Sequence, residues 1–372
     1  MKNRIDQWIT VVAFCAFIGI MSLLYLVLPK QETSELEKRP LEKAPEFSME
    51  ALTSGELGSD IETYMSDHIP GRSFFVGLNS YVDLYTGRQV TKDVYLAEGD
   101  RLVEAPAKWN QEQVDKNMKM VNRFAETLGK EVDFMIVPSG GWASQDLIQG
   151  VSYDYKDETY IGWLYSKAAE GVNCVDIMDV YAGREDLYYR TDHHWTSEGA
   201  YKGYAAYMDA KGRAYPAVED FKVTVAKDFT GSTYTRSGLW MIPGENVEMW
   251  ECTPDLQVTN ENGQPHDGLF YLENLQELDK YTVFLDGNHA TVTIHNPNNV
   301  GKGNLLVIRD SYSNCLGGFL AESYENVVMI DLRNIMPGMV VSELDAQYDF
   351  ADVLVCYSLS NFLTDNNLIK LK

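Results

Sequence analysis

The stretch from Asn304 to Asn314 restricts the fold of this chain more than any other part of its sequence. An apolar run that begins at Leu305 ends abruptly in Asp310 and Ser311. Such a run predicts a buried strand of a parallel sheet, and the carboxyl ends of such strands form the edge at which open α/β sheets bind ligands. A short helix is expected over 314–321. We therefore expect an α/β fold that carries a serine to its ligand-binding edge.

Ser311 is the candidate nucleophile on this turn. A strand, a tight turn and a helix bring a hydroxyl and free backbone N–H groups together, and acyl transfer needs both for attack and oxyanion stabilisation. Ser313 lies on the same turn and is the alternative nucleophile. Taken alone, Ser311 fits the role of a helix cap better, so a catalytic role requires support from another part of the chain.

That support comes from residues 191–195, Thr-Asp-His-His-Trp. A carboxylate bonded to one nitrogen of a histidine ring fixes its tautomer and leaves the other nitrogen free to accept a proton. Asp192 and His194 are two residues apart, so on an extended segment their side chains project to the same side, and His193 points the other way. A helix is expected from Ser197 to about residue 210, which places the pair on a strand-to-helix loop.

A metal site and a structural hydrogen bond are the two alternatives to a catalytic pair. Adjacent histidines bind metals in some proteins, but no HxxxH or CxxC spacing accompanies them here and the two rings are expected to face apart, so we predict no metal. A purely structural hydrogen bond from His194 to Asp192 stays open as the second alternative.

Together, residues 192–195 and the Asp-Ser-Tyr-Ser of 310–313 resemble the DHHW family of bacterial surface proteins. That family is similar to alginate O-acetyltransferase proteins, and both resemble SGNH/GDSL hydrolases in permuted order. The resemblance implies that Asp192 orients His194, that His194 is the base and that Ser311 attacks. Further candidates for substrate or oxyanion contacts are Asn288, Trp195, Arg333, Tyr312 and Ser313.

The implied fold is an SGNH-hydrolase-like three-layer α/β sandwich with a mainly parallel sheet. We expect it to span residues 49–372, with a β-rich insertion at about 221–296 that includes a strand-like run over 281–285. An amphipathic helix is predicted over 111–128. The glycines after Pro138 permit close approach of the backbone, so 138–142 is expected to form either a wall of the site or a simple turn.

The N-terminus carries 21 uncharged, mainly apolar residues from Trp8 to Leu28. That length crosses a hydrocarbon core of about 30 Å as a helix. Because Lys2 and Arg4 precede it, residues 1–30 are expected to be an uncleaved single-pass anchor of the cell membrane with the rest of the chain extracytoplasmic; a cleaved signal peptide is the alternative. Residues 31–48 are polar and are expected to form a linker.

The charge of the chain limits its partners. The formal net charge is −24, from 55 acidic and 31 basic side chains, which excludes nucleic acid as a partner of the whole surface. Neutral glycans bind to proteins through aromatic rings and hydrogen bonds, and the chain has 23 tyrosines and 7 tryptophans that can form such surfaces. A neutral glycan is therefore compatible with this composition.

These observations lead to a functional expectation. The chain is expected to move an acetyl group through an acyl-serine to a glycan or polysaccharide hydroxyl, without a cofactor. The resemblance also implies a membrane-bound O-acyltransferase as partner. A carbohydrate acetylesterase with the same residues, and a non-catalytic glycan-binding or scaffold protein, are the alternatives.

Overall fold

The computed structural model describes residues 2–34, 39–88, 90–150, 154–335 and 341–371. The chain divides into two compact units. The smaller is made of Met1–Arg88 with Thr235–Trp240, and the larger of Gln89–Tyr234 with Met241–Lys372.

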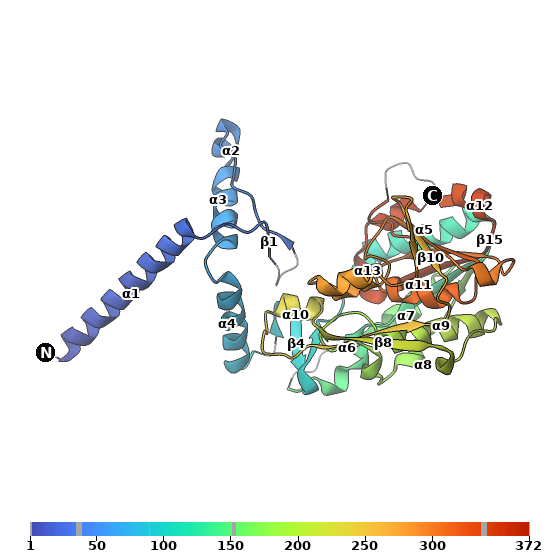
Figure 1. Cartoon of the computed structure of the whole chain (residues 1–372), viewed down its shortest axis with the longest axis horizontal. Coiled ribbons are helices and arrows are strands. Elements are labelled where there is room, and N and C mark those ends of the chain that lie inside the picture. The colour runs from blue at the N-terminus through green and yellow to red at the C-terminus, as the bar shows by residue number, and fades with distance from the viewer. Residues whose placement is uncertain (1, 35–38, 89, 151–153, 336–340, 372) are drawn as a thin grey trace. The chain divides into compact units, whose positions relative to one another are not determined.

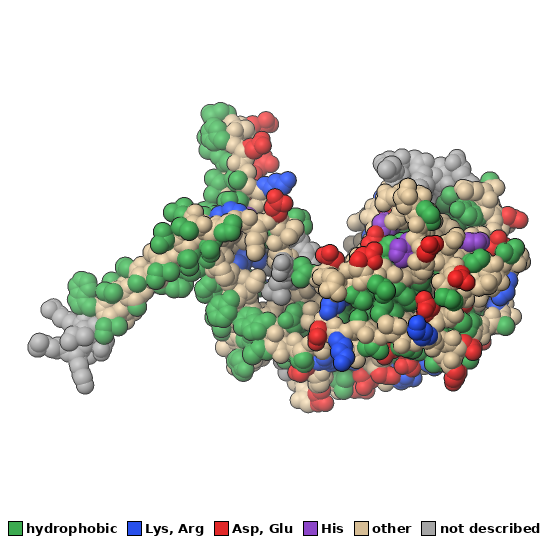
Figure 2. All heavy atoms as spheres, in the orientation of Figure 1, with side chains coloured by type: hydrophobic (Ala, Val, Ile, Leu, Met, Phe, Trp, Pro, Cys, Tyr) green, Lys and Arg blue, Asp and Glu red, His purple; other side chains and the backbone are tan. Residues whose placement is uncertain are grey.

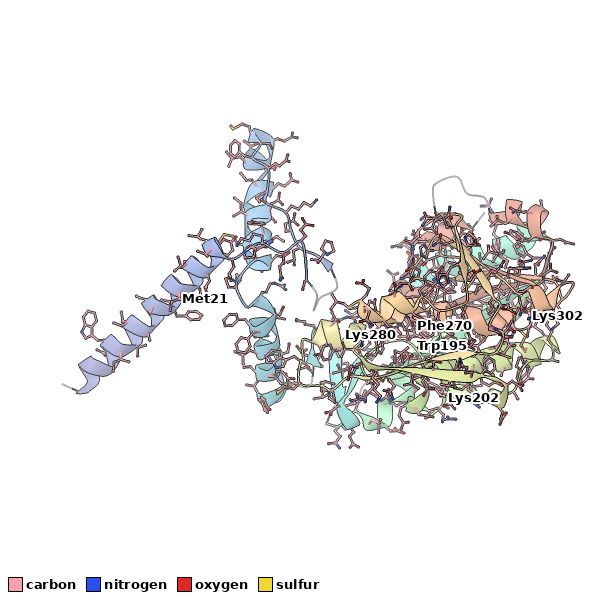
Figure 3. All side chains as sticks on the ribbon, viewed as in Figure 1. Met21, Trp195, Lys202, Phe270, Lys280 and Lys302 are labelled. Carbon is pink, nitrogen blue, oxygen red and sulfur yellow. The ribbon has the colours of Figure 1, made fainter. Side chains whose placement is uncertain are left out.

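The smaller unit begins with helix α1, Lys2–Val27, in which Gln7–Val27 is long and apolar enough to cross a membrane. Its apolar side chains are exposed, as at Trp8 and Leu26, and Figure 2 shows them along the helix while Figure 3 labels Met21 on it. This agrees with a membrane anchor or a signal sequence. The other elements of this unit are β1 (Thr33–Ser34), β2 (Arg39–Pro40), α2 (Met49–Ser54), α3 (Glu56–Asp67) and α4 (Arg72–Tyr85).

The larger unit is a mixed α/β structure built on an eight-stranded sheet of order β11-β10-β12-β14-β13-β15-β6-β7 (Figure 1). Four neighbouring pairs are parallel, from β14 to β7, and three are antiparallel, from β11 to β14. The sheet is therefore mixed, which corrects the expectation of a mainly parallel one. The strands are β6 (Val132–Val137), β7 (Val172–Cys174), β10 (Gln257–Asn260), β11 (Pro265–Asp267), β12 (Thr291–His295), β13 (Asn304–Arg309), β14 (Asn326–Ile330) and β15 (Phe350–Ser358).

Strand β13 is the predicted buried strand, and it separates two apolar cores. Leu305 and Val307 belong to one core, while Leu306 and Ile308 belong to the other, because successive side chains of a strand point to opposite faces. Helices α9 (Ser197–Lys211) and α11 (Ser313–Ala321) contribute to the first core, and α5 (Gln111–Leu128) and α13 (Leu359–Thr364) to the second. The helix predicted over 111–128 is thus confirmed.

The β-rich segment around 221–296 contributes the antiparallel part of the sheet. Strands β10, β11 and β12 extend the central sheet, whereas β8 (Lys222–Phe229) and β9 (Glu245–Glu251) pair only with each other. The strand-like run 281–285 is not a strand: Lys280–Val283 is a 3-10 turn. Leu285, Asp286 and Gly287 then all have positive φ, which turns the chain and prevents extended structure.

The remaining helices and strands have ten residues or fewer, and α10 contains residues of both units. They are β3 (Val90–Thr91), β4 (Val94–Ala97), β5 (Arg101–Glu104), α6 (Gly140–Ala143), α7 (Asp157–Ser166), α8 (Met178–Tyr181), α10 (Ser232–Ser237) and α12 (Val341–Tyr348). Because β13, β15 and β6 are parallel neighbours, Ser311, Ser358 and Ser139 come to one edge of the sheet.

Candidate active site

A chain of two hydrogen bonds joins Asp192, His194 and Ser311 at this edge. His194 Nδ1 lies 2.6 Å from Asp192 Oδ1, and His194 Nε2 lies 2.8 Å from Ser311 Oγ. Ser311 follows β13, and the other two residues lie on the turn before α9. All three are buried, with Ser311 8% exposed. The structure therefore brings together the three residues that the sequence assigned to nucleophile, base and orienting acid.

Asp192 is held by groups beyond the histidine ring. Its Oδ1 accepts the backbone N–H of His194 at 2.9 Å, and its Oδ2 accepts the backbone N–H of Ser232 at 2.6 Å. Burial acts to raise the pKa of Asp192, but the nearby histidines and these hydrogen bonds outweigh it and hold that pKa well below its usual value. Gly231 permits the contact, since a Cβ there would lie 2.1 Å from the Cβ of Asp192.

The position of His193 corrects the expectation that the two histidines face apart. Their ring centroids are 3.9 Å from each other, and His193 Nδ1 lies 2.5 Å from Ser232 Oγ. The alternation expected from an extended segment fails because residues 190–194 form a series of bends and not a strand.

Asp192, His193 and His194 also have metal-ligand atoms within 4.8 Å of one another. Both oxygens of Asp192, however, already accept hydrogen bonds, and His194 uses one ring nitrogen toward Asp192 and the other toward Ser311. Placing a metal here would therefore break the hydrogen bonds that join Asp192 to Ser311.

The serine turn is fixed to the end of β15 by Asp310. Asp310 Oδ2 accepts hydrogen bonds of 2.8 Å from the backbone N–H and the hydroxyl of Ser358 and from Asn361 Nδ2. Its Oδ1 accepts the backbone N–H of Tyr312 at 3.0 Å. A buried carboxylate with this many donors sets the position of Ser311 from the neighbouring strand.

The backbone amides after Ser311 are mostly engaged within the turn. The N–H of Tyr312 donates to the Asp310 carboxylate, that of Ser313 to the Asp310 carbonyl, and that of Asn314 to the Ser311 carbonyl. We expected several free N–H groups near the serine; within this turn, and counting only partners in the described part of the chain, the amide of Ser311 is the one that donates to no other group.

The other residues predicted on this turn have interior positions. Ser313 is completely buried with its hydroxyl against the Cys356 thiol, so it does not take the place of Ser311 beside His194. Trp195, labelled in Figure 3, is also fully buried, and its indole N–H donates to the Tyr312 carbonyl at 2.9 Å. The Tyr312 hydroxyl donates to the His193 carbonyl. Trp195 and Tyr312 thus join the serine turn to the histidine turn.

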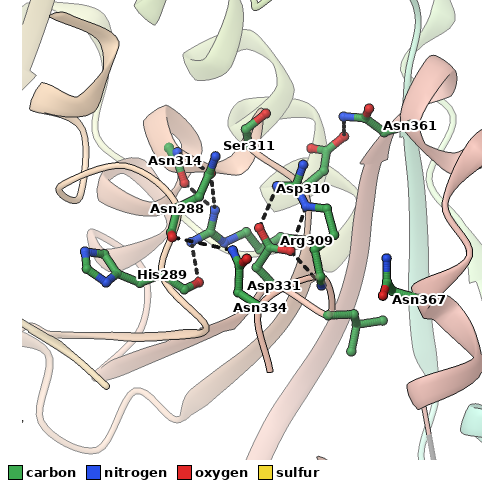
Figure 4. A network of polar contacts seen from close by, with 12 residues as sticks. Asn288, His289, Arg309, Asp310, Ser311, Asn314, Asp331, Asn334, Asn361 and Asn367 are labelled. Carbon is green, nitrogen blue, oxygen red and sulfur yellow. Dashed lines mark hydrogen bonds and ion pairs between the residues drawn. The ribbon is translucent and has the colours of Figure 1, made fainter. Parts of the chain in front are cut away.

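Asn288 is joined to the serine turn directly through Asn314 and also through a buried arginine, Arg309, that the sequence reasoning overlooked (Figure 4). Arg309 is fully buried, and its Nη1 donates to Asn314 and, at 3.4 Å, to Asn288 Oδ1. Asn314 Nδ2 donates to the same Asn288 oxygen at 3.1 Å. These two donors orient the exposed Asn288 amide, leaving its nitrogen for another acceptor. The sequence feature that could have identified Arg309 is its position as a charged residue at the end of an otherwise apolar strand.

Arg333 is paired with Asp331. Its Nε and Nη2 donate to the two Asp331 oxygens at 2.8 and 2.5 Å. Asp331 is completely buried. Bidentate pairs of this kind are common between arginine and a carboxylate. The pair gives Arg333 a structural role, separate from the substrate contact that the sequence suggested.

Tyr281 was not predicted as a site residue, yet it stacks on the His194 ring. The ring centroids are 4.0 Å apart and the planes differ by 8°. Among the described residues, the buried Tyr281 hydroxyl has no hydrogen-bond partner. The stacking restricts the rotation of His194 between Asp192 and Ser311.

The family of the chain follows from comparison with known proteins. The DHHW protein family model matches residues 108–330, more than half of the 372 residues, and the chain therefore belongs to the DHHW family. No curated protein sequence gives a significant match.

Solved structures share this fold at low sequence identity. A DHHW family protein from Eubacterium siraeum has a TM-score of 0.62 and 19% identity, over 76% of this chain and 95% of that one. Bacillus cereus PatB1, solved with and without a sulfonyl adduct, has a TM-score of 0.62 and 21% identity, over 75% of this chain and 98% of that one. The O-acetyltransferase domain of Pseudomonas putida AlgJ is a weaker match, with a TM-score of 0.44 and 13% identity, over 74% of this chain and 94% of that one.

Proposed function

We propose that this protein is an O-acetyltransferase-like enzyme that passes an acetyl group through an acyl-serine to a glycan hydroxyl. One observation carries the proposal: Asp192, His194 and Ser311 form a continuous hydrogen-bonded chain at the carboxyl edge of the parallel strands. The three groups have the order and the contacts of a nucleophile, a base and the acid that orients the base.

In the first half-reaction, His194 Nε2 takes the proton of Ser311 as the serine oxygen attacks the carbonyl carbon of an acetyl ester. The tetrahedral intermediate collapses when the alcohol of the donor leaves and receives that proton from His194. Asp192 stabilises the charged imidazole between these steps, which its own low pKa supports because it stays ionised.

The oxyanion needs preorganised donors in this scheme. We assign that role to the backbone N–H of Ser311 and to the side-chain nitrogen of Asn288. The hydrogen bonds from Arg309 and Asn314 to the Asn288 oxygen support this assignment, because they leave the amide nitrogen as the outward-facing donor.

In the second half-reaction, His194 removes the proton of an acceptor hydroxyl, whose oxygen attacks the acetyl carbon. When the bond from that carbon to Ser311 Oγ breaks, His194 returns the proton to the serine oxygen, which restores both side chains. The acidic chain favours a neutral acceptor. The resemblance to alginate O-acetyltransferase proteins favours a polysaccharide over another alcohol.

Three finer expectations belong to the same proposal. We propose that the fold is of the SGNH-hydrolase type, that α1 is a single-pass anchor with the larger unit outside the cytoplasm, and that a membrane-bound O-acyltransferase supplies the acetyl group. The length and apolar character of Gln7–Val27 support the anchor.

The test uses the chain from Gln31 onward, incubated with p-nitrophenyl acetate and followed by intact-mass spectrometry and peptide mapping. An acetyl adduct on Ser311 is expected in the wild type and in Ser313→Ala, and none in Ser311→Ala. An adduct that persists in Ser311→Ala and disappears in Ser313→Ala would reverse the choice of nucleophile.

An acetylesterase shares the first half-reaction, so the same hydrogen-bonded chain also favours it as the second candidate. The two are separated by the product: a transferase forms acetylated sugar when a glycan is present, and an esterase releases acetate regardless. If neither an adduct nor acetate appears with any activated ester, the proposal is replaced by the non-catalytic glycan-binding alternative.

A further inference from the structure

We propose that a narrow cavity beside the hydrogen-bonded chain is an acceptor subsite that binds one neutral hydroxymethyl arm of a sugar, an inference that rests on the proposed transfer function. Its lining includes Ser139, Gly140 and Ser144 from α6 and its two caps, and also His193, Thr233 and Tyr312. The predicted alternative that 138–142 forms a wall of the site is consistent with this lining.

Two unsatisfied hydroxyls support a ligand at this position. Ser144 is 1% exposed and Thr233 is 0% exposed, and among the described residues neither hydroxyl has a hydrogen-bond partner. A buried polar group without a partner destabilises the folded state, because it has lost its hydrogen bonds to water and gained none in the protein. Both of these hydroxyls border the same cavity, which a ligand with its own hydroxyl would complete.

Most other hydroxyls of the lining are already used within the protein. Ser139 Oγ accepts the backbone N–H of Trp142 at 3.2 Å, Ser358 Oγ donates to Asp310, and the Tyr188 hydroxyl donates to the Pro138 carbonyl. These groups shape the cavity, while Ser144 and Thr233 retain hydrogen-bonding capacity for a ligand.

The size and charge of the cavity define the class of ligand. Its volume is about 20 Å³, while one water molecule needs roughly 10–15 Å³, so a hydroxymethyl group enters and a sugar ring does not. The guanidinium of Arg101, which also lines the cavity, donates to the carbonyls of Tyr188 and Tyr189. The lining also includes two acidic residues, Glu104 and Asp192, and Tyr189, whose buried hydroxyl likewise has no hydrogen-bond partner among the described residues. With Arg101 bonded to two carbonyls and two carboxylates in the lining, the cavity suits a neutral ligand that carries a hydroxyl over an anionic one.

The position of the cavity next to the proposed catalytic residues suits an acceptor sugar. Tyr312 directly follows Ser311, and His193 directly precedes His194, so the cavity is bordered by the chain neighbours of both the proposed nucleophile and the proposed base. A sugar anchored there by one arm keeps its ring outside the cavity and near the acyl-serine.

The test compares cellopentaose with xylopentaose as acceptors, with p-nitrophenyl acetate as donor. These sugars have the same linkages, but xylose lacks the hydroxymethyl arm. In the wild type, the KM for cellopentaose is expected to be lower than that for xylopentaose. Ser144→Ala and Thr233→Val are each expected to raise the KM for cellopentaose by roughly two- to tenfold, the value of one neutral hydrogen bond, and to lower the ratio of acetylated sugar to free acetate.

Stability supplies a second readout. Because both substitutions remove a buried hydroxyl without a partner, the Tm of each variant should equal or exceed that of the wild type. Thr291→Val is the matched control: its hydroxyl is also buried without a partner among the described residues, but Thr291 lies on β12 and does not line the cavity. It should leave both KM values unchanged.

Unchanged KM values in Ser144→Ala and Thr233→Val, or equal KM values for the two sugars in the wild type, would overturn the subsite. A lower Tm of either variant together with an equal rise in KM for both sugars would also overturn the subsite, because it would indicate that the hydroxyl has a structural role. If Ser311 is not acetylated at all, the proposed function fails separately. In that case a Tm increase of the wild type with cellopentaose, absent with xylopentaose and in both variants, still supports the subsite, and its absence overturns it.

Discussion

His194 Nε2 and Ser311 Oγ lie 2.8 Å apart although the two residues are 117 positions apart in the chain. The indole of Trp195 and the hydroxyl of Tyr312, each next to one member of this pair, donate to the backbone of the opposite turn. Two hydrogen bonds of opposite direction therefore join the two turns that carry the pair, and they fix its geometry within the folded core.

Replacing Asp192 by asparagine should lower the rate of acyl transfer by up to about 10⁴-fold, because the amide favours the wrong histidine tautomer. Full activity of Asp192→Asn would refute the role of the carboxylate. Assays of p-nitrophenyl acetate turnover measure this, with circular dichroism to confirm that the variant is folded.

The pH dependence of stability offers a separate test of Asp192. Its pKa is lowered by folding, so its ionised form stabilises the native state above the unfolded pKa of about 3.9, and this contribution is lost as the pH falls below that value. The difference in unfolding free energy between the wild type and Asp192→Asn should therefore shrink below about pH 4. Denaturant titrations between pH 3 and pH 7 check it, and a constant difference would contradict the lowered pKa.

Arg309 and Asn288 should act as a unit. Asn288→Ala is expected to reduce kcat by about 10²- to 10³-fold if its nitrogen is an oxyanion donor. Arg309→Lys keeps the charge but loses the planar guanidinium, whose Nη1 donates to both amides while its Nη2 donates to the His289 carbonyl, and should reduce kcat by roughly tenfold. In an Asn288→Ala background, Arg309→Lys should have little further effect on kcat. Additive losses would show that Arg309 acts through another group.

Tyr281 offers a matched pair of substitutions. Tyr281→Phe keeps the ring stacked on His194 and removes a buried hydroxyl that has no partner among the described residues, so kcat should stay near that of the wild type and Tm should not fall. Tyr281→Leu removes the stacking and should lower kcat by roughly ten- to a hundredfold through misplacement of His194. Equal activity of the two variants would exclude a positioning role for the ring.

The N-terminal helix is tested by fractionation and intact mass. The full chain is expected in the membrane fraction with its N-terminus retained, and the chain from Gln31 onward in the soluble fraction. A mature mass that begins after the helix would identify a signal sequence.

The local spacing of apolar residues was sufficient to predict the helices and strands in which that spacing is regular. The helix over 111–128 and the strand that ends at Arg309 were predicted because their apolar spacing is unambiguous over their full length. The prediction of a strand over 281–285 failed for the opposite reason, since five residues rich in β-forming side chains did not reveal the left-handed turn at Leu285 and Asp286.

The sequence by itself determined the chemical types at the site: a serine at a strand end, and an aspartate and histidine two residues apart before a helix. Those are local properties of the chain. Only the tertiary structure decided which serine meets the histidine, that Arg309 orients Asn288, that the sheet is mixed, and that Ser144 and Thr233 border one cavity. Each of these depends on contacts between residues far apart in the chain, which are set by packing and strand pairing and leave no periodic signal in the sequence.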